Sequence, residues 1–517
     1  MPLRPKIILV ADRTLSANYS IIFEGMFGTM QTTYVPEFIM KTLMAPKMPV
    51  DSEGRAVAVP LGLRRVEATL LAEANLTTDS LVCATPETLP SLIGDWTKLV
   101  IVSSSDPLGR GMSNSTTTSF WPGRLYTEFW TDKMMTELAA AKKKHDFKIM
   151  TGGAGSWQWH QDEEISHKHG IDAIWEGYFE QGGTEFVNHL LHDTMPAEYI
   201  EPSGIAHFSS NNCAIDKVKP INGPSMLGIV ELSRGCGKAC NFCPMSDKKM
   251  QHLPLDLICQ DVETNVAAGF KNVVSGSEDF LRYGADGFKP DFDKLCELLN
   301  AMRRIPNKNF LQVDHVNISS VLQFDDHELK ELRQLMNWES RCEYLWVNMG
   351  AETASGELLK ANCAGKALPY DVENWDQMII EASDKLIRCG FFPVLSFVLG
   401  LPGETPADVK KTLALVRELV KRKLVIFPIF FEPSDREFRK IAPAFGVGQM
   451  TLDYLDLYSA CYEQNFKEVP PMFWDNQRAG GVSFGKRLLV RTLGTTEVIK
   501  WRGAFKKIRK RLQQSNA

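Results

Sequence analysis

The strongest constraint on the fold is a regular alternation of short apolar runs with amphipathic stretches along the first 200 residues. The apolar runs are continuous, as in strands buried on both faces, and the stretches between them have helical periodicity. This alternation predicts a parallel, doubly wound α/β sheet with helices on both faces. The predicted strands are Lys6–Ala11, Ser80–Ala84, Leu99–Ser103, Phe147–Met150 and Ile171–Trp175.

A second β/α series follows a polar, proline-bearing segment. Six apolar runs in roughly 210 residues predict a partial (β/α)6 barrel rather than an eight-fold one. The predicted domains are a Rossmann-like domain over residues 1–200, a linker over 201–225, a barrel over 226–441 and a helical C-terminal extension over 442–517. The predicted barrel strands are Leu227–Leu232, Asn272–Val274, Phe310–Val316, Tyr344–Met349, Val394–Leu399 and Leu424–Phe430.

Composition excludes several classes of protein. The chain of 517 residues is 44% hydrophobic and 23% charged, which is ordinary for a globular protein, and its net charge of −5 gives no reason to expect nucleic-acid binding. No apolar run approaches the roughly 18 residues that a membrane span needs, and the N-terminal apolar run is too short for a secretory signal. Eleven scattered cysteines predict a cytoplasmic protein in which clustered cysteines serve metal binding or catalysis.

The most specific motif is a group of three cysteines with the spacing C-x3-C-x2-C, directly after the first barrel strand. A [4Fe–4S] cluster normally takes four thiolates, so Cys236, Cys240 and Cys243 would leave one iron open to a small chelating molecule. An amino-carboxylate, such as the methionine end of S-adenosylmethionine (SAM), can fill that position. The alternative is a zinc site, but zinc would need a further ligand at short spacing, and the nearest downstream histidine, His252, is isolated.

With this motif in its barrel context, the region from about Leu227 to Pro433 resembles the radical SAM enzymes. Ser275–Asp279 stands where that family has a glycine-and-acid motif for the SAM amino group, but it lacks the usual paired glycines. Gly350–Ser355 resembles the family's G-x-E-[ST] segment, and Gly400–Thr405 its G-x-P-G-E-T turn. A carboxylate at a helix start, without chemistry, is the alternative for both glutamates, and we favour it for Glu404. The resemblance implies that the catalytic cluster ligands are Cys236, Cys240 and Cys243, and that SAM contacts Phe242, Gly276, Glu278, Asp279, Glu352 and Ser396.

A doubly wound domain in front of such a barrel resembles the cobalamin-binding class of the radical SAM family. The likeness lies in Ser103–Ser105, in Gly152–Gly155 and in Ile171–Gly177, where the final glutamate and glycine stand in swapped order. Small residues at strand ends allow a bulky nucleotide tail to approach the backbone. The alternatives are a nucleotide-binding domain, for which no G-x-G-x-x-G follows the first strand, and a purely structural domain. The implied cobalamin contacts are Asp12, Thr14, Leu15, Ser103, Ser104, Ser105, Gly152, Gly153, Gly155, Glu176 and Gly177.

Cobalamin domains that ligate cobalt through histidine carry a D-x-H-x-x-G loop after the first strand, and this chain has none there. Its only D-x-H, Asp325-Asp326-His327, lacks the glycine. The resemblance therefore implies cobalamin without a histidine on the lower face of cobalt. The polar insertion at residues 109–122 is either a cover over the cofactor or a surface loop.

Three further features have simpler interpretations. The other eight cysteines are expected to be small buried hydrophobic residues, with Cys363 the most plausible exception. His167 and His169 are expected to be solvated rather than metal-bound. The basic segment Lys500–Leu512 has one apolar stripe and could contact an acidic partner, a membrane or RNA, but we expect it to dock on the acidic body of the protein.

The family resemblance implies a cobalamin-dependent radical SAM C-methyltransferase. A 5′-deoxyadenosyl radical would activate an unreactive carbon, methylcobalamin would deliver the methyl group, and an external donor would supply electrons. Ala11–Ser16 and the overall length also resemble the methanogen enzymes that C-methylate a glutamine of methyl-coenzyme M reductase. A protein or peptide substrate would suit the basic segment and the aromatic patch at Phe473 and Trp474, and a small molecule stays open. Rearrangement or ring closure by a related enzyme, and a non-enzymatic metal-cluster protein, are the other hypotheses.

Overall fold

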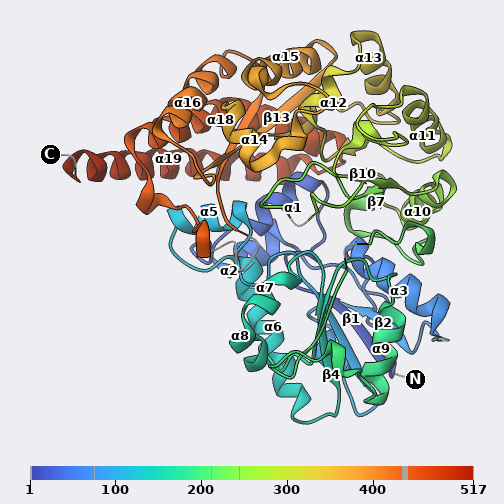
Figure 1. The fold of residues 1–517 in the computed structure, drawn as a ribbon. Coiled ribbons are helices and arrows are strands. Elements are labelled where there is room, and N and C mark those ends of the chain that lie inside the picture. Colours follow the sequence, from blue (N-terminus) through green and yellow to red (C-terminus); the bar gives the residue numbers. More distant parts are fainter. Residues whose placement is uncertain (1–2, 75, 211, 244, 434–439, 516–517) are drawn as a thin grey trace. The chain divides into compact units, whose positions relative to one another are not determined.

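The structure is a computed structural model that describes residues 3–515 except 75, 211, 244 and 434–439. The chain forms two compact units (Figure 1). The first comprises residues 1–230 and 253–270, and the second comprises residues 231–252 and 271–517. Among the described residues, no helix is both long and apolar enough to cross a membrane.

The first unit contains a six-stranded parallel sheet in the order β2-β1-β3-β4-β5-β6. From β1 the chain moves outward to β2 and then returns to β3 on the other side of β1. The carboxyl ends of β1 and β3 therefore form the topological switch point at which doubly wound sheets bind ligands. The strands are β1 (Ile7–Ala11), β2 (Leu81–Ala84), β3 (Leu99–Ser103), β4 (Lys148–Gly152), β5 (Ala173–Glu176) and β6 (Ala206–Ser209).

Two separate cores cover the faces of this sheet, which confirms the doubly wound prediction (Figure 1). In β1, Ile7 and Leu9 belong to the core formed with α3 and α9, whereas Ile8 and Val10 belong to the core formed with α6 and α7. Burial on both faces explains why the strands are continuous apolar runs. The helices are α3 (Leu61–Glu73), α6 (Tyr126–Lys142), α7 (Ser156–Gln161) and α9 (Gly183–His192).

Strand β6 lies within the segment that the sequence indicates as a linker. It pairs in parallel with β5 at the edge of the sheet. His207 and Ser209 alternate with apolar residues, so this edge strand lacks the continuous apolar run of the inner strands.

Helix α10 (Leu255–Ala267) belongs to the first unit although the sequence places it in the barrel. Asp261 of α10 forms a fully buried ion pair of 2.6 Å with Arg65 of α3, and it accepts a hydrogen bond of 3.0 Å from the Ile221 backbone. The carbonyl oxygen of the Asn265 side chain accepts one of 2.7 Å from the backbone of Ser225. These bonds attach both α10 and the segment before β7 to the first unit.

The predicted barrel strands from β10 onward lie in the second unit, and β7 contains the boundary between the two units. Two three-stranded parallel groups, β11-β10-β7 and β12-β13-β14, are joined by a parallel bridge between His315 and Asn348. The order β7-β10-β11-β12-β13-β14 follows the chain, so the structure confirms the partial (β/α)6 barrel. The strands are β7 (Ile229–Glu231), β10 (Val273–Gly276), β11 (Leu311–Val313), β12 (Leu345–Glu352), β13 (Phe391–Leu399) and β14 (Val425–Phe430), with helices α11 (Phe292–Arg304), α12 (Ile318–Leu322), α13 (Asp326–Leu335), α14 (Gly356–Cys363), α15 (Trp375–Arg388) and α16 (Pro406–Leu419).

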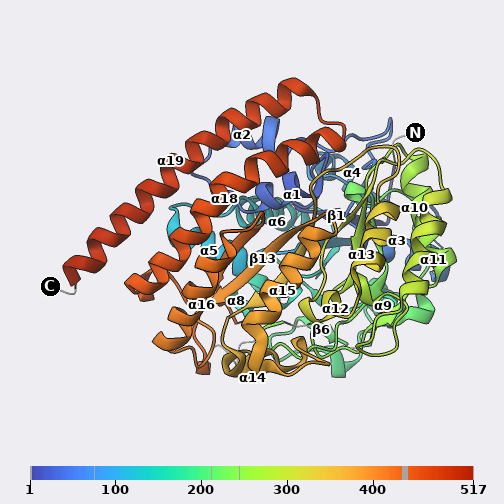
Figure 2. The same ribbon diagram turned by 90° about the horizontal axis from the view of Figure 1, so that it is seen from above.

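Two long helices, α18 (Leu452–Ala479) and α19 (Phe484–Ser515), lie side by side in the second unit (Figure 2). The Trp501 ring of α19 packs 4.3 Å from the Tyr462 ring of α18, measured between centroids. Arg509 of α19 forms an ion pair of 2.5 Å with Asp456 of α18. The basic segment therefore docks on aromatic and acidic side chains of its own chain, as predicted.

Candidate functional site

The three cysteines lie on a tightly folded loop after β7. Gly235, Gly237 and Ala239 have φ values of +78°, +70° and +53°, so every second residue of this stretch is left-handed. A Cβ on Gly235 would lie 2.6 Å from the carbonyl oxygen of Lys249, so only glycine fits against the returning chain. The Cys236 amide donates a hydrogen bond of 2.9 Å to the Lys248 carbonyl, which ties the loop to that return segment.

Ser246 fixes the second half of the cysteine loop. Its hydroxyl lies 2.7 Å from the carbonyl oxygens of both Cys240 and Cys243. Burial raises the pKa of Cys236 to about 12 and that of Cys243 to about 11, so both thiols keep their protons when no metal is bound. Metal binding would displace these protons. Three sulfur donors on one loop fit an iron–sulfur cluster or zinc.

Two buried cations border the cysteine loop. The Lys238 ammonium lies 3.1 Å from the Ser319 hydroxyl and 4.7 Å from the centre of the Phe288 ring, and burial lowers the pKa of Lys238 to about 8. Arg282 donates a hydrogen bond of 2.9 Å to the Cys236 carbonyl, and its guanidinium carbon lies 4.7 Å from the centre of the same Phe288 ring. A [4Fe–4S] cluster with three thiolates carries a net negative charge, which these cations would offset.

Glu352 forms a buried ion pair at the end of β12. It has a left-handed φ of +60° and pairs with Lys366, whose ammonium also donates a hydrogen bond of 3.1 Å to the Gly350 carbonyl. A Cβ on Gly350 would lie 2.1 Å from the Lys366 nitrogen, so the glycine of the G-x-E segment makes room for the ion pair. Ser355, not Glu352, is the N-cap of α14, which excludes the capping alternative for Glu352.

A fourth cysteine lies beside the cysteine loop. The Asn241 backbone and side chain donate hydrogen bonds of 2.9 and 2.8 Å to the backbone and side-chain oxygens of Asn362. This brings the buried Cys363 next to Cys240, and a hydrogen bond from the Cys363 thiol lowers the pKa of Cys240. The sequence flagged Cys363 only by its polar and glycine-rich surroundings, because its contact with Cys240 depends on tertiary structure.

The two acids after β10 have different surroundings. Asp279 is completely buried, and its carboxylate accepts hydrogen bonds from the Asn317 backbone and side chain at 3.1 and 2.9 Å and from the Ser320 hydroxyl at 2.6 Å. It therefore holds the start of α12. Glu278 is partly accessible, and burial raises its pKa. A SAM contact stays a prediction for both acids.

The remaining predicted SAM residues lie on barrel strands or on the cysteine loop. Gly276 ends β10, and Ser396 of β13 lies opposite Gly350 of β12 in the strand register. The Phe242 ring packs edge-on against Phe431, with 6.4 Å between centroids. Their contacts with SAM also stay predictions.

Glu404 closes the turn after β13. One carboxylate oxygen accepts hydrogen bonds of 2.6 Å from the Gly400 amide and 2.7 Å from the Tyr454 hydroxyl. Burial raises the pKa of Glu404 to about 7. We expected Glu404 to be a structural carboxylate at the start of a helix. Thr405 is the N-cap of α16, so Glu404 does not cap the helix, and its hydrogen bonds stabilise the turn before it.

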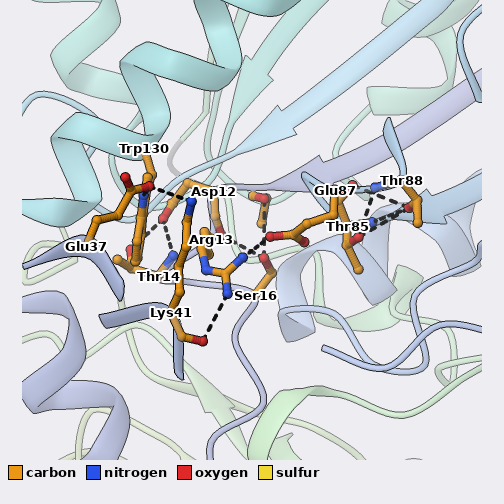
Figure 3. Close-up of polar contacts among 11 residues, drawn as sticks. Asp12, Arg13, Thr14, Ser16, Glu37, Lys41, Thr85, Glu87, Thr88 and Trp130 are labelled. Carbon is orange, nitrogen blue, oxygen red and sulfur yellow. Dashed lines mark hydrogen bonds and ion pairs between the residues drawn. The ribbon is translucent and has the colours of Figure 1, made fainter. Parts of the chain in front are cut away.

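In the first unit, Asp12 joins the loops at the switch point. Its first carboxylate oxygen accepts hydrogen bonds from the amides of Thr14 (2.9 Å) and Leu15 (3.2 Å), and its second accepts one from the Ser104 hydroxyl (3.0 Å). Burial raises the pKa of this completely buried carboxyl. Figure 3 shows this loop together with Arg13, which forms an ion pair with Glu87.

Glycines bring the loops after β3 and β4 together. Gly153 has a φ of +89°, and a Cβ there would lie 2.6 Å from the Ser103 hydroxyl. A Cβ on Gly155 would lie 2.8 Å from the carbonyl of Ser105. Gly152 ends β4 next to them. Two of the three segments that resemble cobalamin-binding sequences therefore pack against each other at this edge of the sheet.

The third segment ends in a histidine–carboxylate cluster. His160 and His207 lie 3.3 and 3.2 Å from the same carboxylate oxygen of Glu176. Burial opposes ionisation of Glu176, but the hydrogen bonds from both histidines outweigh it and lower the pKa to about 2. Gly177 follows with a φ of +109°, and a Cβ there would lie 2.5 Å from the Ser210 carbonyl. Cobalamin contacts at this segment stay predictions.

Comparison with known proteins identifies the class of the barrel. Residues 230–416 match the family model of the Radical SAM superfamily, so the chain contains a radical SAM domain. The chain is 23% identical over 217 residues to the threonylcarbamoyladenosine tRNA methylthiotransferase MtaB of Thermotoga maritima, covering 41% of this chain and 45% of the relative. It is 25% identical over 305 residues to a tRNA-2-methylthio-N(6)-dimethylallyladenosine synthase of Methylacidiphilum infernorum, covering 56% and 60%. The chain thus spans about half the length of these curated relatives.

The fold of both units has a solved counterpart. Two structures of TsrM from Kitasatospora setae, a radical SAM methyltransferase, match with TM-scores of 0.53 and 0.51 at 14% identity. The matches cover 84% and 82% of this chain and 76% and 72% of TsrM. One contains tryptophan and a SAM analogue, and the other contains cobalamin and a [4Fe–4S] cluster. At this identity the likeness shows the fold, and it confirms the predicted α/β architecture.

Proposed function

We propose that this protein is a cobalamin-dependent radical SAM methyltransferase that methylates an unreactive carbon. The observation that carries the proposal is the three-cysteine loop, fixed by Ser246 and bordered by buried Lys238 and Arg282, within a radical SAM domain. When bound, a reduced [4Fe–4S] cluster supplies the electron that cleaves SAM to a 5′-deoxyadenosyl radical, and methylcobalamin supplies the methyl group.

The residues of the second unit form three groups: those that would bind the cluster, those that would offset its charge and those that would contact SAM. Cys236, Cys240 and Cys243 would hold the cluster and leave a position on it for SAM. Lys238 and Arg282 offset the negative charge of the thiolates. Phe242, Gly276, Glu278, Asp279, Glu352 and Ser396 are the proposed SAM contacts.

The first unit is the proposed cobalamin domain. Three features support this role: the strand order with its switch point, the joined loops after β3 and β4, and the fold likeness to a protein solved with cobalamin. The first histidine of the chain is His145, so the loops after β1, β2 and β3 offer cobalt no imidazole. We therefore propose that cobalamin binds without a histidine on its lower face.

For the substrate we propose a protein residue, such as the glutamine of methyl-coenzyme M reductase, with electrons from an external donor. A small molecule is the alternative, and the fold likeness to TsrM, solved with tryptophan, favours it. The Trp474 part of the aromatic patch is already used internally, because the Arg487 guanidinium lies 4.6 Å from its ring centre and the Phe484 ring packs 5.9 Å away.

Methylthio transfer is the second candidate function, because both curated relatives are enzymes that install methylthio groups. A methylthio product contains one sulfur atom more than a methyl product, so the enzyme needs a sulfur donor. An additional iron–sulfur cluster would require at least three further clustered ligands. The first 230 residues contain only two cysteines, Cys83 and Cys213, and the Cys83 thiol is buried against the Glu67 carboxylate. Two cysteines are too few for an additional cluster there, so we favour methyl transfer.

The test uses protein purified and reconstituted without oxygen, with iron, sulfide, zinc and corrinoid counted. It is then incubated with reductant, candidate substrate and SAM carrying a labelled methyl group. If the enzyme transfers a methyl group, the assay should yield 5′-deoxyadenosine and a product in which one labelled methyl group replaces a hydrogen atom. A product that also gains sulfur supports methylthio transfer, and 5′-deoxyadenosine with no gain in product mass supports rearrangement or ring closure. Zinc without sulfide would contradict any radical SAM activity.

Matched variants separate the two cofactor sites. Changing Cys236, Cys240 and Cys243 together to alanine should abolish SAM cleavage and leave corrinoid bound. Cys296→Ala, on the outer face of α11, should change neither. Loss of corrinoid in the triple variant would show that the proposed division between the two units is wrong.

A further inference from the structure

The cluster of His160, Glu176 and His207 gathers three metal-binding side chains in the first unit, away from the cysteine loop in sequence. His160 lies on α7, Glu176 ends β5, and His207 lies on the edge strand β6. The ligand atoms of all three lie within 4.8 Å of one another. None of the proposed roles in methyl transfer uses the two histidines, whereas Glu176 is also one of the expected cobalamin contacts.

The distances within this cluster match those between ligands of one cation. Zinc binds imidazole nitrogen and carboxylate oxygen at about 2.0–2.2 Å in tetrahedral geometry, which separates neighbouring ligand atoms by roughly 3.3 Å. Here the His160 Nδ1 and the His207 Nε2 lie 3.3 and 3.2 Å from Oε1 of Glu176. Both separations are therefore those expected between neighbouring ligands of one zinc ion.

A second carboxylate orients one of the histidines as in metal sites. The Nδ1 of His207 lies 3.2 Å from a carboxylate oxygen of Glu201. An ionised carboxylate only accepts hydrogen bonds, so this nitrogen carries the proton and donates. Metal-binding histidines typically donate their second ring nitrogen to a carboxylate in this way.

We propose that His160, Glu176 and His207 form a binding site for a divalent transition-metal cation of the zinc class, with Glu201 as a positioning residue. Two imidazoles and one carboxylate suit zinc. The His160 side chain is 40% exposed and that of His207 is 11% exposed, so the site is open to solvent on the α7 side, where water completes the coordination. The metal would fasten the edge strand β6 to β5 and α7.

The test is zinc binding by the full chain. Reconstituted protein is stripped with a chelator and titrated with Zn²⁺, and zinc, iron and sulfide are counted. We expect one tightly bound zinc per chain, unchanged iron and sulfide, and an X-ray absorption spectrum with nitrogen and oxygen but no sulfur around zinc. Zinc should also raise the temperature at which the first unit unfolds, because it binds only the folded site.

Variants identify the ligands. His160→Ala, which changes a half-exposed residue, and His207→Ala should each weaken zinc binding at least tenfold, and Glu201→Gln should weaken it about 10–100-fold, as loss of an orienting carboxylate does. The matched control is His167→Ala, at an exposed histidine of the neighbouring helix α8 (Glu163–Lys168), which should bind zinc like the wild type.

Three results would overturn the proposal: no zinc retained, sulfur around the zinc, or zinc binding unchanged in both histidine variants. The triple cysteine-to-alanine variant removes thiolate binding and should still hold one zinc. These readouts are independent of SAM cleavage and methyl transfer, so the zinc site and the proposed function can fail separately.

Discussion

Replacing Lys366 by methionine should destabilise the second unit strongly. The Lys366 side chain is 9% exposed and the Glu352 side chain 6% exposed, and the two form an ion pair next to the cysteine loop. Lys366→Met keeps most of the side-chain volume but removes the positive charge. Glu352 is then a buried carboxylate without its cationic partner, and the Gly350 carbonyl loses a hydrogen bond.

The size of the effect follows from this burial. Removing one partner of a buried ion pair costs about 3–5 kcal/mol, because the other charge stays buried and uncompensated. Glu352→Gln should also destabilise the protein, because it leaves the Lys366 ammonium unpaired. The double variant removes both charges, so its loss should be smaller than the sum of the single losses by about 1–3 kcal/mol.

The assay is urea unfolding of the full chain without cofactors, followed by tryptophan fluorescence. Lys360→Met is the matched control, because Lys360 is exposed on the adjoining helix α14, and it should change the free energy of unfolding by less than about 0.5 kcal/mol. If Lys366→Met is as mild as this control, or if the two single losses are simply additive, the buried ion pair does not contribute as argued.

Three further predictions concern other sites. Cys363→Ser should keep four irons per chain, because three thiolates suffice, and loss of iron would show that Cys363 is a ligand. Glu404 has a pKa of about 7 in the folded protein against an ordinary 4.5, so the folded state holds a proton that the unfolded state loses first. The free energy of unfolding should therefore fall by up to about 3 kcal/mol as pH rises from 4.5 through 7, and Glu404→Gln should flatten this slope in urea titrations. Asp261→Ala should lower the free energy of unfolding of the first unit by about 3–5 kcal/mol by removing the carboxylate that pairs with the buried Arg65, and a change below about 1 kcal/mol in calorimetry would contradict this.

The sequence predicted the inner strands because burial on both faces leaves no room for polar residues. All five predicted strands of the first unit form, and so do the six strands of the barrel. Strand β6 was not predicted, because an edge strand tolerates polar side chains such as His207 and Ser209. Helix α10 was assigned to the barrel, because its attachment to the first unit depends on long-range contacts, such as the ion pair between Asp261 and Arg65, that sequence does not show.

The candidate site residues that could be predicted are those that come directly after a strand in the sequence. In parallel sheets the carboxyl ends of all strands meet at one edge, so residues just after a strand, such as Asp12 and Cys236, are natural candidates. Their partners were not predictable. Lys366 and His160 lie in helical segments whose sequence carries no motif. Only the fold brings Lys366 to Glu352 in the second unit and His160 to Glu176 in the first.

The buried charges around the cysteine loop are better explained by a ligand than by stability. Replacing a buried ion pair with apolar residues of similar size is often neutral or stabilising, so a stable core alone has no need of the pair formed by Lys366 and Glu352. The left-handed φ of Glu352 adds a further cost of about 1–3 kcal/mol for a residue other than glycine. Lys238 and Arg282 add two more buried cations beside thiols that hold their protons. Binding a cluster converts those thiols to thiolates, and the same cations then face negative charge at short range. The unfavourable arrangement of the free protein thus becomes complementary to an anionic cluster.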